Sequence, residues 1–565
     1  MNLSVQKLPP YRGYWIEGDT PPSGDIKAVQ DALYAVTRPL VLVDKGDGSP
    51  AAASGGYLVS GLSMDAGIPE TVALGKKSYP LLAFAPVLRP EDMGDAGFKN
   101  RHHLRYACIA GAMANGITSV AMVEAMARAG MMGIFGAAGL TLPEVEKAIF
   151  DVQNKLDDLP YGFNLIHSPG DPELEAAVAD LYLRRGIYRI CASAYLNLTL
   201  PLVRYRVSGI HQTPQGDIVC PHQIIAKVSR EEVARKFFSP PPDKFLAQLV
   251  ENRQISPQQA ELARHIPMAD SLTAEADSGG HTDNRPAISL LPTIMALRDD
   301  MVRAYRYPHT IPVGLGGGIG TPHATAAAFA MGAAYVLTGS VNQACVEAGT
   351  SDTVKRLLAE TAQADVTMAP AADMFEMGVK VQVLKRGTMF AQRAAKLYEL
   401  YSAYDCLEKV PDNVQSLLER DYFKCSLNDA WKNTQAFFQQ RDPRQLTRAE
   451  KDPHYKMALV FRSYLGQSSR WATTGNPDRR MDYQIWCGPA MGAFNAWVRG
   501  SFLEAPEQRN TVTIAMNFLF GACILTRAHW IRSQGVLLPF NAAAYAPLQP
   551  GHIAERLHLP NSHNQ

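Results

Sequence analysis

Two glycine-rich stretches in the second half of the chain have the residue types that bind an anion. They read GLGGGIGTPHA at 314–324 and VLTGSVNQ at 336–343. Glycine has no side chain to keep an anion away from backbone N–H groups, and the threonine–proline pair predicts a helix whose N-terminus faces the same ligand. One such stretch alone is more often an ordinary turn, so a phosphate site requires that the two lie side by side. The residues that would then hold the phosphate are Gly316, Gly317, Gly318, Gly339 and Ser340.

A third stretch, AEADSGGHTDNRP at 274–286, places a histidine directly after two glycines. His281 could act as an acid or a base near neutral pH, because the ordinary pKa of histidine is about 6.5. Gly279 and Gly280 would let the backbone come close to a flat ligand. The alternative is an exposed turn with a solvated histidine. Only the vicinity of the two phosphate stretches favours the functional interpretation.

An asparagine and a histidine occur at the end of a further apolar run, GFNLIHSP at 162–169. The amide of Asn164 would be costly in an apolar strand unless it is hydrogen-bonded. It either bonds to the backbone or lies against a ligand ring, and the sequence leaves both open.

Eight short apolar runs, most of them followed by a helical pattern, connect these stretches. Alternating strands and helices predict a parallel sheet, and eight such units over about 260–300 residues match a (β/α)₈ TIM barrel. An open sheet of the dinucleotide-binding kind would need a G-x-G-x-x-G fingerprint, which is absent. In a barrel the three stretches would meet at the C-terminal ends of the strands. The eight runs are 81–86, 132–136, 162–166, 188–193, 223–228, 272–276, 311–318 and 333–340.

The remaining chain predicts three further parts around this α/β barrel. Residues 1–75 read as a small N-terminal α/β segment, and the barrel is expected over 76–380. A helical insertion is expected at about 200–270, and a mainly helical C-terminal region over 381–565. The C-terminal region contains three tryptophans, Trp471, Trp486 and Trp497, that alternate with glycines.

The composition excludes several other classes of protein. The chain of 565 residues has 55 basic and 54 acidic side chains, so no global field would attract nucleic acid or an anionic membrane. Its eight cysteines contain no C-x-x-C pair, which argues against a zinc site and a disulfide framework. The N-terminus lacks the apolar core of a secretory signal, and no uncharged run reaches the ~20 residues of a membrane span. We therefore expect a cytoplasmic protein without a bound metal.

The strings LLAFAP, FGAAGL, GFNLIHSPGDPELE, TAEADSGGHTDNRP, VGLGGGIGTPHA and VLTGSVNQ occur in this order. This combination resembles the nitronate monooxygenase-like flavoprotein superfamily. The later strings KVQVLKRGTMFAQRAAKLYELY, SSRWATTGN and DYQIWCGPAMGAFNAWVRG resemble one branch of it. That branch is the PfaD-like trans-acting enoyl reductases of polyketide and polyunsaturated fatty acid synthases. The resemblance covers roughly residues 80–525.

The resemblance implies a barrel that binds FMN without a covalent bond. The phosphate would lie on the two glycine-rich stretches, and His281 matches the histidine near the flavin in related enoyl reductases. NADPH, or NADH, would reduce the flavin, which would pass a hydride to the β-carbon of an α,β-unsaturated thioester. His281 would supply the proton for the α-carbon or bond to the thioester carbonyl. The flavin ring is expected near Ala85, Pro86, Asn164 and Glu275.

The resemblance also implies a lid and an acyl channel, which the insertion at 200–270 and the region 380–525 with its tryptophans would form.

It implies partners as well. The enoyl thioester would arrive on the phosphopantetheine arm of an acyl carrier protein of a polyketide synthase assembly line. Because carrier proteins are acidic, a basic patch is expected near the entrance, with candidates at 184–186 and 384–387. A homodimer is left open.

Three rival functions remain. A nitronate monooxygenase would use the same flavin, with oxygen as oxidant and His281 as base. An acyltransferase is disfavoured because the chain has no G-x-S-x-G elbow. A flavin-free scaffold that only binds carrier proteins is the third.

Overall fold

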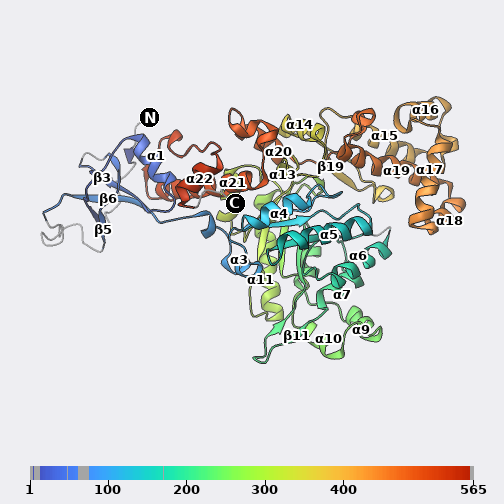
Figure 1. Ribbon diagram of the computed structural model, residues 1–565, viewed down its shortest axis with the longest axis horizontal. Coiled ribbons are helices and arrows are strands. Elements are labelled where there is room, and N and C mark those ends of the chain that lie inside the picture. Colours follow the sequence, from blue (N-terminus) through green and yellow to red (C-terminus); the bar gives the residue numbers. More distant parts are fainter. Residues whose placement is uncertain (1–3, 6–12, 47–48, 61–74, 169–170, 560–565) are drawn as a thin grey trace.

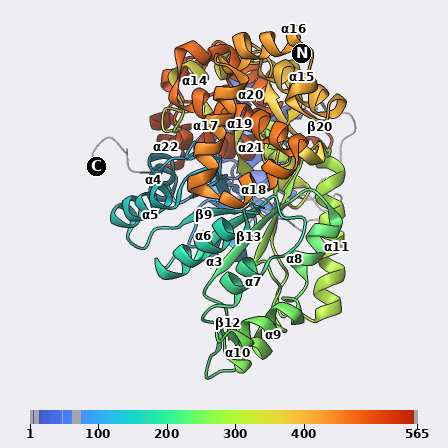
Figure 2. The ribbon, with the colours of Figure 1, turned by 90° about the vertical axis from the view of Figure 1, so that its right-hand side faces the viewer.

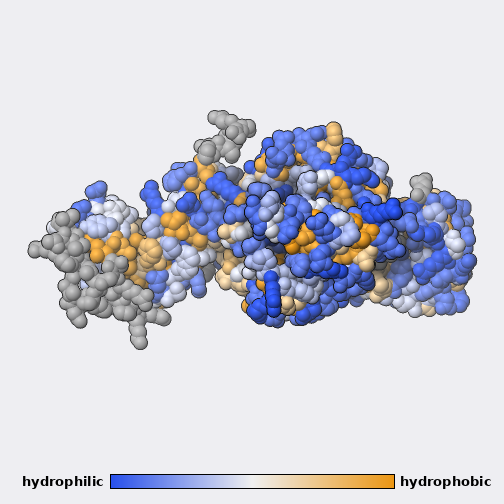
Figure 3. Space-filling view, turned by 90° about the horizontal axis from the view of Figure 1, so that it is seen from below, coloured by the Kyte–Doolittle hydropathy of each residue, from blue (hydrophilic) through white to orange (hydrophobic). Residues whose placement is uncertain are grey.

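The computed structural model describes residues 4–5, 13–46, 49–60, 75–168 and 171–559. Along its longest axis the molecule has an N-terminal sheet at one end, a barrel in the middle and the helices of residues 390–474 at the other end (Figure 1). Figure 2 shows the C-terminal helices stacked on top of the barrel. On the face seen from below, the surface is mainly hydrophilic, with apolar residues in scattered groups, one of them over the N-terminal sheet (Figure 3).

Eight parallel strands form a closed barrel, which confirms the predicted fold class. Helices follow the strands on the outside, and several of them begin with a side chain that caps the backbone. Glu144, for example, accepts a hydrogen bond from the backbone N–H of Thr141 at 2.7 Å. The strands are β7 (Cys108–Ala110), β8 (Met132–Phe135), β9 (Tyr161–Ile166), β10 (Arg189–Ser193), β13 (Gln223–Val228), β14 (Ser271–Glu275), β16 (Val313–Gly316) and β17 (Val336–Thr338). The helices around them are α4 (Val120–Arg128), α5 (Leu142–Leu156), α6 (Pro172–Arg184), α7 (Leu200–Val207), α8 (Glu231–Phe238), α11 (Ala287–Tyr305), α12 (Pro322–Ala330) and α13 (Ser340–Gln343).

The first barrel strand is not the run at 81–86, and that prediction is wrong. This run belongs to β6 (Ser78–Ala85), which pairs antiparallel with β2 (Gly13–Ile16) and β3 (Leu40–Asp44). With β4 (Pro50–Ala53) and β5 (Tyr57–Ser60) these strands form a five-stranded sheet, so the N-terminal part extends beyond residue 75. The true first strand is β7, whose three residues are too short to stand out as an apolar run.

The elements that residues 200–270 add to the barrel lie at the end opposite the mouth, where the mouth is the end at which the strands finish. The hairpin of β11 (His211–Gln212) and β12 (Ile218–Val219) separates α7 from β13, while α9 (Asp243–Glu251) and α10 (Pro257–Ala263) separate α8 from β14. Connections from a helix to the next strand lie at the N-terminal ends of the strands, so these elements cannot form a lid (Figure 1). The stretch also contains β13, a barrel strand.

The C-terminal region is mainly helical, as predicted, and begins with a small sheet. In this sheet β15 (Gly280–His281), β18 (Val366–Pro370) and β19 (Lys380–Leu384) pair antiparallel in the order β15-β19-β18. The sheet therefore joins the loop after β14 to the C-terminal region. The helices here are α14 (Asp352–Ala359), α15 (Phe390–Ala403), α16 (Asp412–Leu417), α17 (Leu427–Arg441), α18 (Pro443–Lys451), α19 (Pro453–Thr474) and α20 (Ala490–Val498).

One long helix, α21 (Thr511–Ser533), ties the N-terminal sheet to the barrel. It packs against α12 and β6, and Arg527 donates hydrogen bonds to the backbone oxygens of Leu33 and Arg38, at 2.9 and 2.8 Å, beside α1 (Ile26–Tyr34). Within the described chain, α21 is the helix that is long and apolar enough to cross a bilayer, but 78% of its apolar window is buried inside the protein. The helix α22 (Pro550–Leu557) packs against it. Burial of this kind is typical of a core helix.

Phe520→Ala should lower the free energy of unfolding by about 3–5 kcal/mol, because a buried phenylalanine leaves both lost burial and a cavity. Phe520 has no exposed surface and packs edge-on against Tyr34 across the two parts. Denaturant unfolding would measure the loss. Phe150→Ala is the matched control, because Phe150 is 63% exposed and its removal should change stability by less than about 0.5 kcal/mol. Equal effects of the two changes would contradict the core role of α21.

Candidate active site

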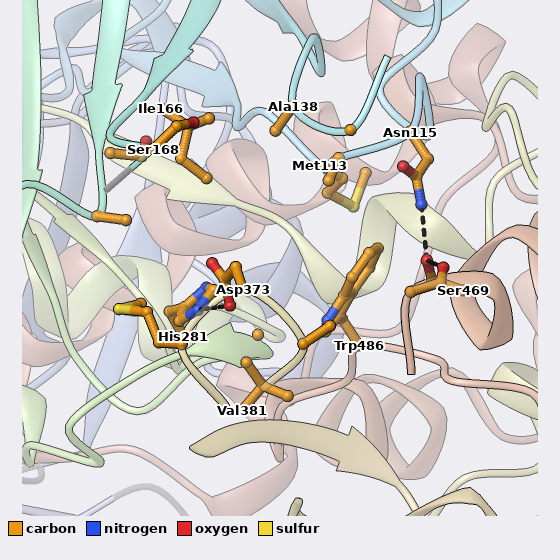
Figure 4. Close-up of a pocket in the computed structure, with 18 of the residues that line it drawn as sticks. Met113, Asn115, Ala138, Ile166, Ser168, His281, Asp373, Val381, Ser469 and Trp486 are labelled. Atoms are coloured by element: carbon orange, nitrogen blue, oxygen red, sulfur yellow. Dashed lines mark hydrogen bonds and ion pairs between the residues drawn. The ribbon is translucent and has the colours of Figure 1, made fainter. Parts of the chain in front are cut away.

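A large cavity lies at the C-terminal ends of the barrel strands, with a volume of about 1340 Å³. One wall consists of the strand ends, and the other consists of β19, α17, α19 and the segment 484–490. Figure 4 shows how side chains from both walls face each other. Pockets for a single drug-sized ligand usually measure about 300–1000 Å³, so this cavity has room for two ligands side by side.

The structure brings ten of the predicted site residues together in the wall of this cavity. They are Asn164, Glu275, Gly279, Gly280, His281, Gly316, Gly317, Gly318, Gly339 and Ser340. Ala85 and Pro86 are not among its lining residues, which corrects their assignment. Ala85 is fully buried in the N-terminal sheet, because its strand pairs there and not in the barrel. Their place at the mouth is taken by Gly111, Ala112 and Met113, which follow β7.

The two glycine-rich turns form a cradle of free backbone donors. Among the described residues, no acceptor is found for the N–H groups of Gly317, Gly318, Gly339 and Ser340. A Cβ on Gly318 or Gly339 would meet no atom within 4 Å, so the space in front of both residues is open. Gly317 and Gly318 have φ values of 82° and 75°, a conformation that favours glycine. Backbone N–H groups are almost always paired, so this set is suited to an anion supplied by a ligand.

Gly279 is required by contact with the protein itself. A Cβ on Gly279 would lie 2.8 Å from the backbone nitrogen of Cys487, and a Cβ on Gly488 would lie 2.8 Å from the backbone nitrogen of Gly279. The two chain segments therefore cross at a distance that only glycine permits. Gly280 has a φ of 82° and lies beside Trp486. The glycines expected to admit a flat ligand thus also admit the C-terminal segment.

The side chain of Gln382 in β19 forms hydrogen bonds with the loop that follows β14. Its Nε2 donates to Oδ1 of Asp277 and to the backbone oxygen of Ser278, both at 2.8 Å, and its Oε1 accepts from Asn284 at 3.1 Å. The residue is only 5% exposed. Gln382 was not among the predicted site residues, because nothing in the local sequence indicates a partner about a hundred residues away.

Polar side chains line the floor of the cavity. Nδ2 of Asn164 donates to the backbone oxygen of Cys191 at 3.0 Å and to Oγ of Ser193 at 3.1 Å, so the amide is bonded and still lines the cavity. Lys227 forms an ion pair with Glu275 at the ends of β13 and β14. Burial lowers the pKa of Lys227, but the charge of Glu275 outweighs it and the net pKa is raised. This ammonium group is therefore charged at neutral pH.

His281 points into the cavity from β15 and forms a pair with Asp373 (Figure 4). Its Nε2 lies 3.2 Å from Oδ1 of Asp373. Burial lowers the pKa of His281, but the hydrogen bond and the negative charge of Asp373 outweigh burial and raise the pKa above its usual value. The charged form of the imidazole at the cavity wall is therefore favoured by its carboxylate partner.

His167 belongs to a second, separate polar pair. Its Nδ1 lies 3.0 Å from Oε2 of Glu175, a carboxylate that also accepts hydrogen bonds from Tyr195 at 3.1 Å and from Thr199.

Within the described residues, no cluster of three histidine, cysteine or acidic side chains is placed to hold a metal ion.

The outer part of the cavity is aromatic. The helical segment above the barrel contributes Phe423, Phe437, Phe438 and Trp471, and Leu174 and Val178 of α6 line the opposite side. Of the three tryptophans expected in a channel, Trp471 and Trp486 line the cavity. Trp497 instead packs against Phe494 and Phe518 away from it. Arg441 of α17 and Asp171 at the start of α6 also line the cavity and form an ion pair at 3.4 Å.

Neither of the predicted basic patches lies at this cavity. Residues 184–186 lie at the C-terminal end of α6. Because α6 starts at the mouth, its 13 residues end at the opposite side of the barrel, about 20 Å away. Arg386, in the second candidate stretch, pairs with Glu360 at 3.5 Å and with Asp365 at 3.8 Å. No residue of either patch lines the cavity.

Gly279→Ala should destabilise the closed mouth by about 1–3 kcal/mol, because the new methyl group would overlap backbone atoms. The strand β15, which pairs with β19, begins one residue after Gly279. Faster hydrogen exchange of the backbone amides in β19 would therefore report the opening. Gly551→Ala in α22 is the control, since its Cβ would meet no atom within 4 Å. That change should leave exchange in β19 as it is, and unaltered exchange in Gly279→Ala would contradict the close crossing.

Comparisons with known proteins agree with this architecture. Residues 404–483 match the family model of the acyl-carrier-protein S-malonyltransferase inserted helical domain. The crystal structure of the enoyl reductase domain of MlnA, from the macrolactin biosynthesis cluster of Bacillus amyloliquefaciens, is 36% identical. The likeness has a TM-score of 0.75 and covers 78% of this chain and 99% of that one.

Three curated relatives are larger proteins. The chain is 47% identical to the polyketide biosynthesis protein PksE of Bacillus subtilis over 77% of its own length and 56% of that protein. It is 44% identical to the polyketide biosynthesis protein ThaF of Burkholderia thailandensis over 80% of its own length and 39% of that protein. A polyunsaturated fatty acid synthase protein of a Thraustochytrium species is also 44% identical, over 82% of this chain and 32% of that protein. The chain thus spans between about a third and about a half of these relatives. Its barrel, its cavity and its likeness to MlnA along nearly all of that domain show that the chain belongs to the PfaD-like enoyl reductase family of polyketide and polyunsaturated fatty acid synthases.

Proposed function

We propose that the chain is an FMN-dependent enoyl reductase that takes a hydride from NADPH, or from NADH, and reduces carrier-bound enoyl thioesters. The observation that carries the proposal is the meeting of the two glycine turns and His281 in one cavity. A phosphate cradle and an acid group at the same barrel mouth are what a flavin reductase of this family needs. The reaction class is supported by the 36% identity to the MlnA domain, which is an enoyl reductase domain.

The chain's own residues fit FMN. The free N–H groups of Gly317, Gly318, Gly339 and Ser340 would hold its phosphate. When bound, the flavin would supply the hydride chemistry. Asn164 and Met113 lie on the wall where a flat ring would extend from that cradle, and Lys227 offers a positive charge on the same floor. The residues therefore provide both ends of a flavin site.

The substrate would occupy the outer, aromatic part of the cavity. The volume of the whole cavity exceeds what one drug-sized ligand needs, and Phe437, Phe438 and Trp471 offer apolar surface for an acyl group. We propose that the acyl substrate arrives on the phosphopantetheine arm of an acyl carrier protein of a polyketide or polyunsaturated fatty acid synthase. The relatives named for such pathways support this partner. No acyltransferase activity is proposed, because the malonyltransferase match is confined to the inserted helices and the chain lacks a G-x-S-x-G elbow.

His281 would complete the reaction on the protein side. Its imidazolium would donate a proton to the α-carbon, or a hydrogen bond to the thioester oxygen as negative charge develops there. The aromatic wall would exclude water from this step.

Gly339→Asp should weaken FMN binding at least about tenfold relative to Gly339→Asn, because a carboxylate near a phosphate costs about 1–4 kcal/mol in a partly buried site. Gly339 suits this test, since it has an ordinary φ of −131° and open space in front of it. Titration of the flavin-free protein with FMN, followed by flavin fluorescence, gives both dissociation constants. Equal affinities of the two variants would remove the cradle from the proposal.

His281→Ala should keep FMN bound and lower enoyl reduction by about 10²–10⁴-fold, the usual contribution of a positioned acid. The assay is anaerobic oxidation of NADPH with a crotonyl-loaded carrier protein. A nitroalkane with oxygen and without NADPH is the parallel assay. Fast turnover there, with no NADPH oxidation, would favour the monooxygenase rival; a colourless protein that binds only the carrier would favour the scaffold.

A further inference from the structure

The strand that carries His281 belongs to a sheet with the C-terminal region, so the position of the imidazole is not set by the barrel alone. His281 lies opposite Val381 in the β15–β19 pair. Residues on directly opposite positions of an antiparallel pair share a face of the sheet. Asp373 lies in the loop that connects β18 and β19 of the same sheet, 92 residues along the chain from His281.

The loop with Asp373 is held on both sides. Nε of Arg462 in α19 donates to the backbone oxygen of Ala372 at 2.9 Å, and its Nη1 donates to Oε1 of Glu376 at 2.9 Å. Phe375 has no exposed surface and packs on Tyr398 and Tyr401. Asp373 therefore meets His281 from a fixed position.

We infer that Asp373 is the positioning residue of the proposed reaction: it accepts a hydrogen bond from Nε2 of His281 and thereby directs Nδ1 of the charged imidazole to the substrate. This inference rests on the proposed function, because it names the group that orients the proton donor. A hydrogen bond from one ring nitrogen decides which nitrogen faces the reaction. The pair is partly exposed to the cavity, at 33% and 44% of the side chains, so it contributes little to stability.

The proton balance of the step is complete. The hydride that reaches the β-carbon carries two electrons, and the α-carbon is left with an electron pair. The N–H bond at Nδ1 breaks, its proton bonds to the α-carbon, and the neutral imidazole regains a proton from solvent. Asp373 keeps its charge throughout.

Several other charges surround the pair and do not replace Asp373. The raised pKa of His281 follows mainly from Asp373 against burial, while Lys227 lowers it and Glu275 raises it. Asp283, two residues from His281, is engaged by Arg230 at 2.8 Å and by Ser229. The charged groups on the neighbouring elements are Lys227, Arg230, Glu275, Asp283, Glu376, Lys380 and Arg462.

The test compares Asp373→Asn with Asp373→Glu in the purified full chain. Asparagine keeps an acceptor and removes the charge, whereas glutamate keeps the charge. We expect the pKa of His281 to fall by about one pH unit in Asp373→Asn and to stay near the wild-type value in Asp373→Glu, because an opposite charge at this distance raises the pKa of histidine by about one unit or more. A histidine-selective NMR titration measures it, with His281→Ala to assign the signal among 14 histidines.

The pH profile of enoyl reduction gives the second readout. The rate needs the protonated imidazole, so kcat falls as pH rises through the pKa of His281. In Asp373→Asn that fall should begin about one pH unit lower, which makes kcat about tenfold smaller on the basic side with KM unchanged. An unchanged NMR pKa, or a profile that coincides with wild type, would overturn the inference. If the pKa of His281 measured by NMR falls in Asp373→Asn but wild-type protein shows no enoyl reduction, the interaction of His281 with Asp373 is supported and the proposed function is contradicted.

Discussion

Two backbone pairings, Gly280 with Gln382 and His281 with Val381, hold the C-terminal region across the mouth of the barrel. Without them the segment after β14 would be an open loop with a solvated histidine. With them, the loop becomes one strand of a sheet whose other strands come from residues 366–384. The close crossing of Gly279 and Gly488 and the side chain of Gln382 depend on the same contact. The cavity is therefore built jointly by the barrel and by the C-terminal region.

This joint construction explains how the proposed anion cradle and the His281–Asp373 pair come to line one cavity. β14, β16 and β17 are neighbours in the barrel, so the loops that follow them must meet at its mouth. The cradle at Gly318 and Gly339 faces the cavity from the barrel side. The charge that acts on His281 comes from the other side, through Asp373. Ser340 touches both sides, since its Oγ accepts from the backbone N–H of Gly488 at 3.0 Å.

The sequence predicted strands correctly where the pattern lies within a few adjacent residues. It failed where the hydrogen-bond partner of a strand determines which sheet the strand joins. Seven of the eight barrel strands lie where the sequence has apolar runs. The run at 81–86 and the strand at 108–110 are both apolar, and only their hydrogen-bond partners show which of them closes the barrel. Ala85 and Pro86 were misplaced for this reason. The basic stretch at 184–186 was misplaced because charge alone does not tell which end of a barrel a helix reaches.

The sequence by itself predicted the barrel, and it predicted that two glycine-rich turns and a histidine meet at its mouth. It could do so because backbone freedom, helix starts and strand polarity depend on adjacent residues. Tertiary structure alone decided that Asp373 faces that histidine, that Gly279 and Gly488 cross, and that the aromatic side chains at 423–471 cover the mouth. These contacts join residues about a hundred or more positions apart. The free energy of these contacts depends on how separately folded parts pack against each other. A short stretch of sequence does not determine that packing.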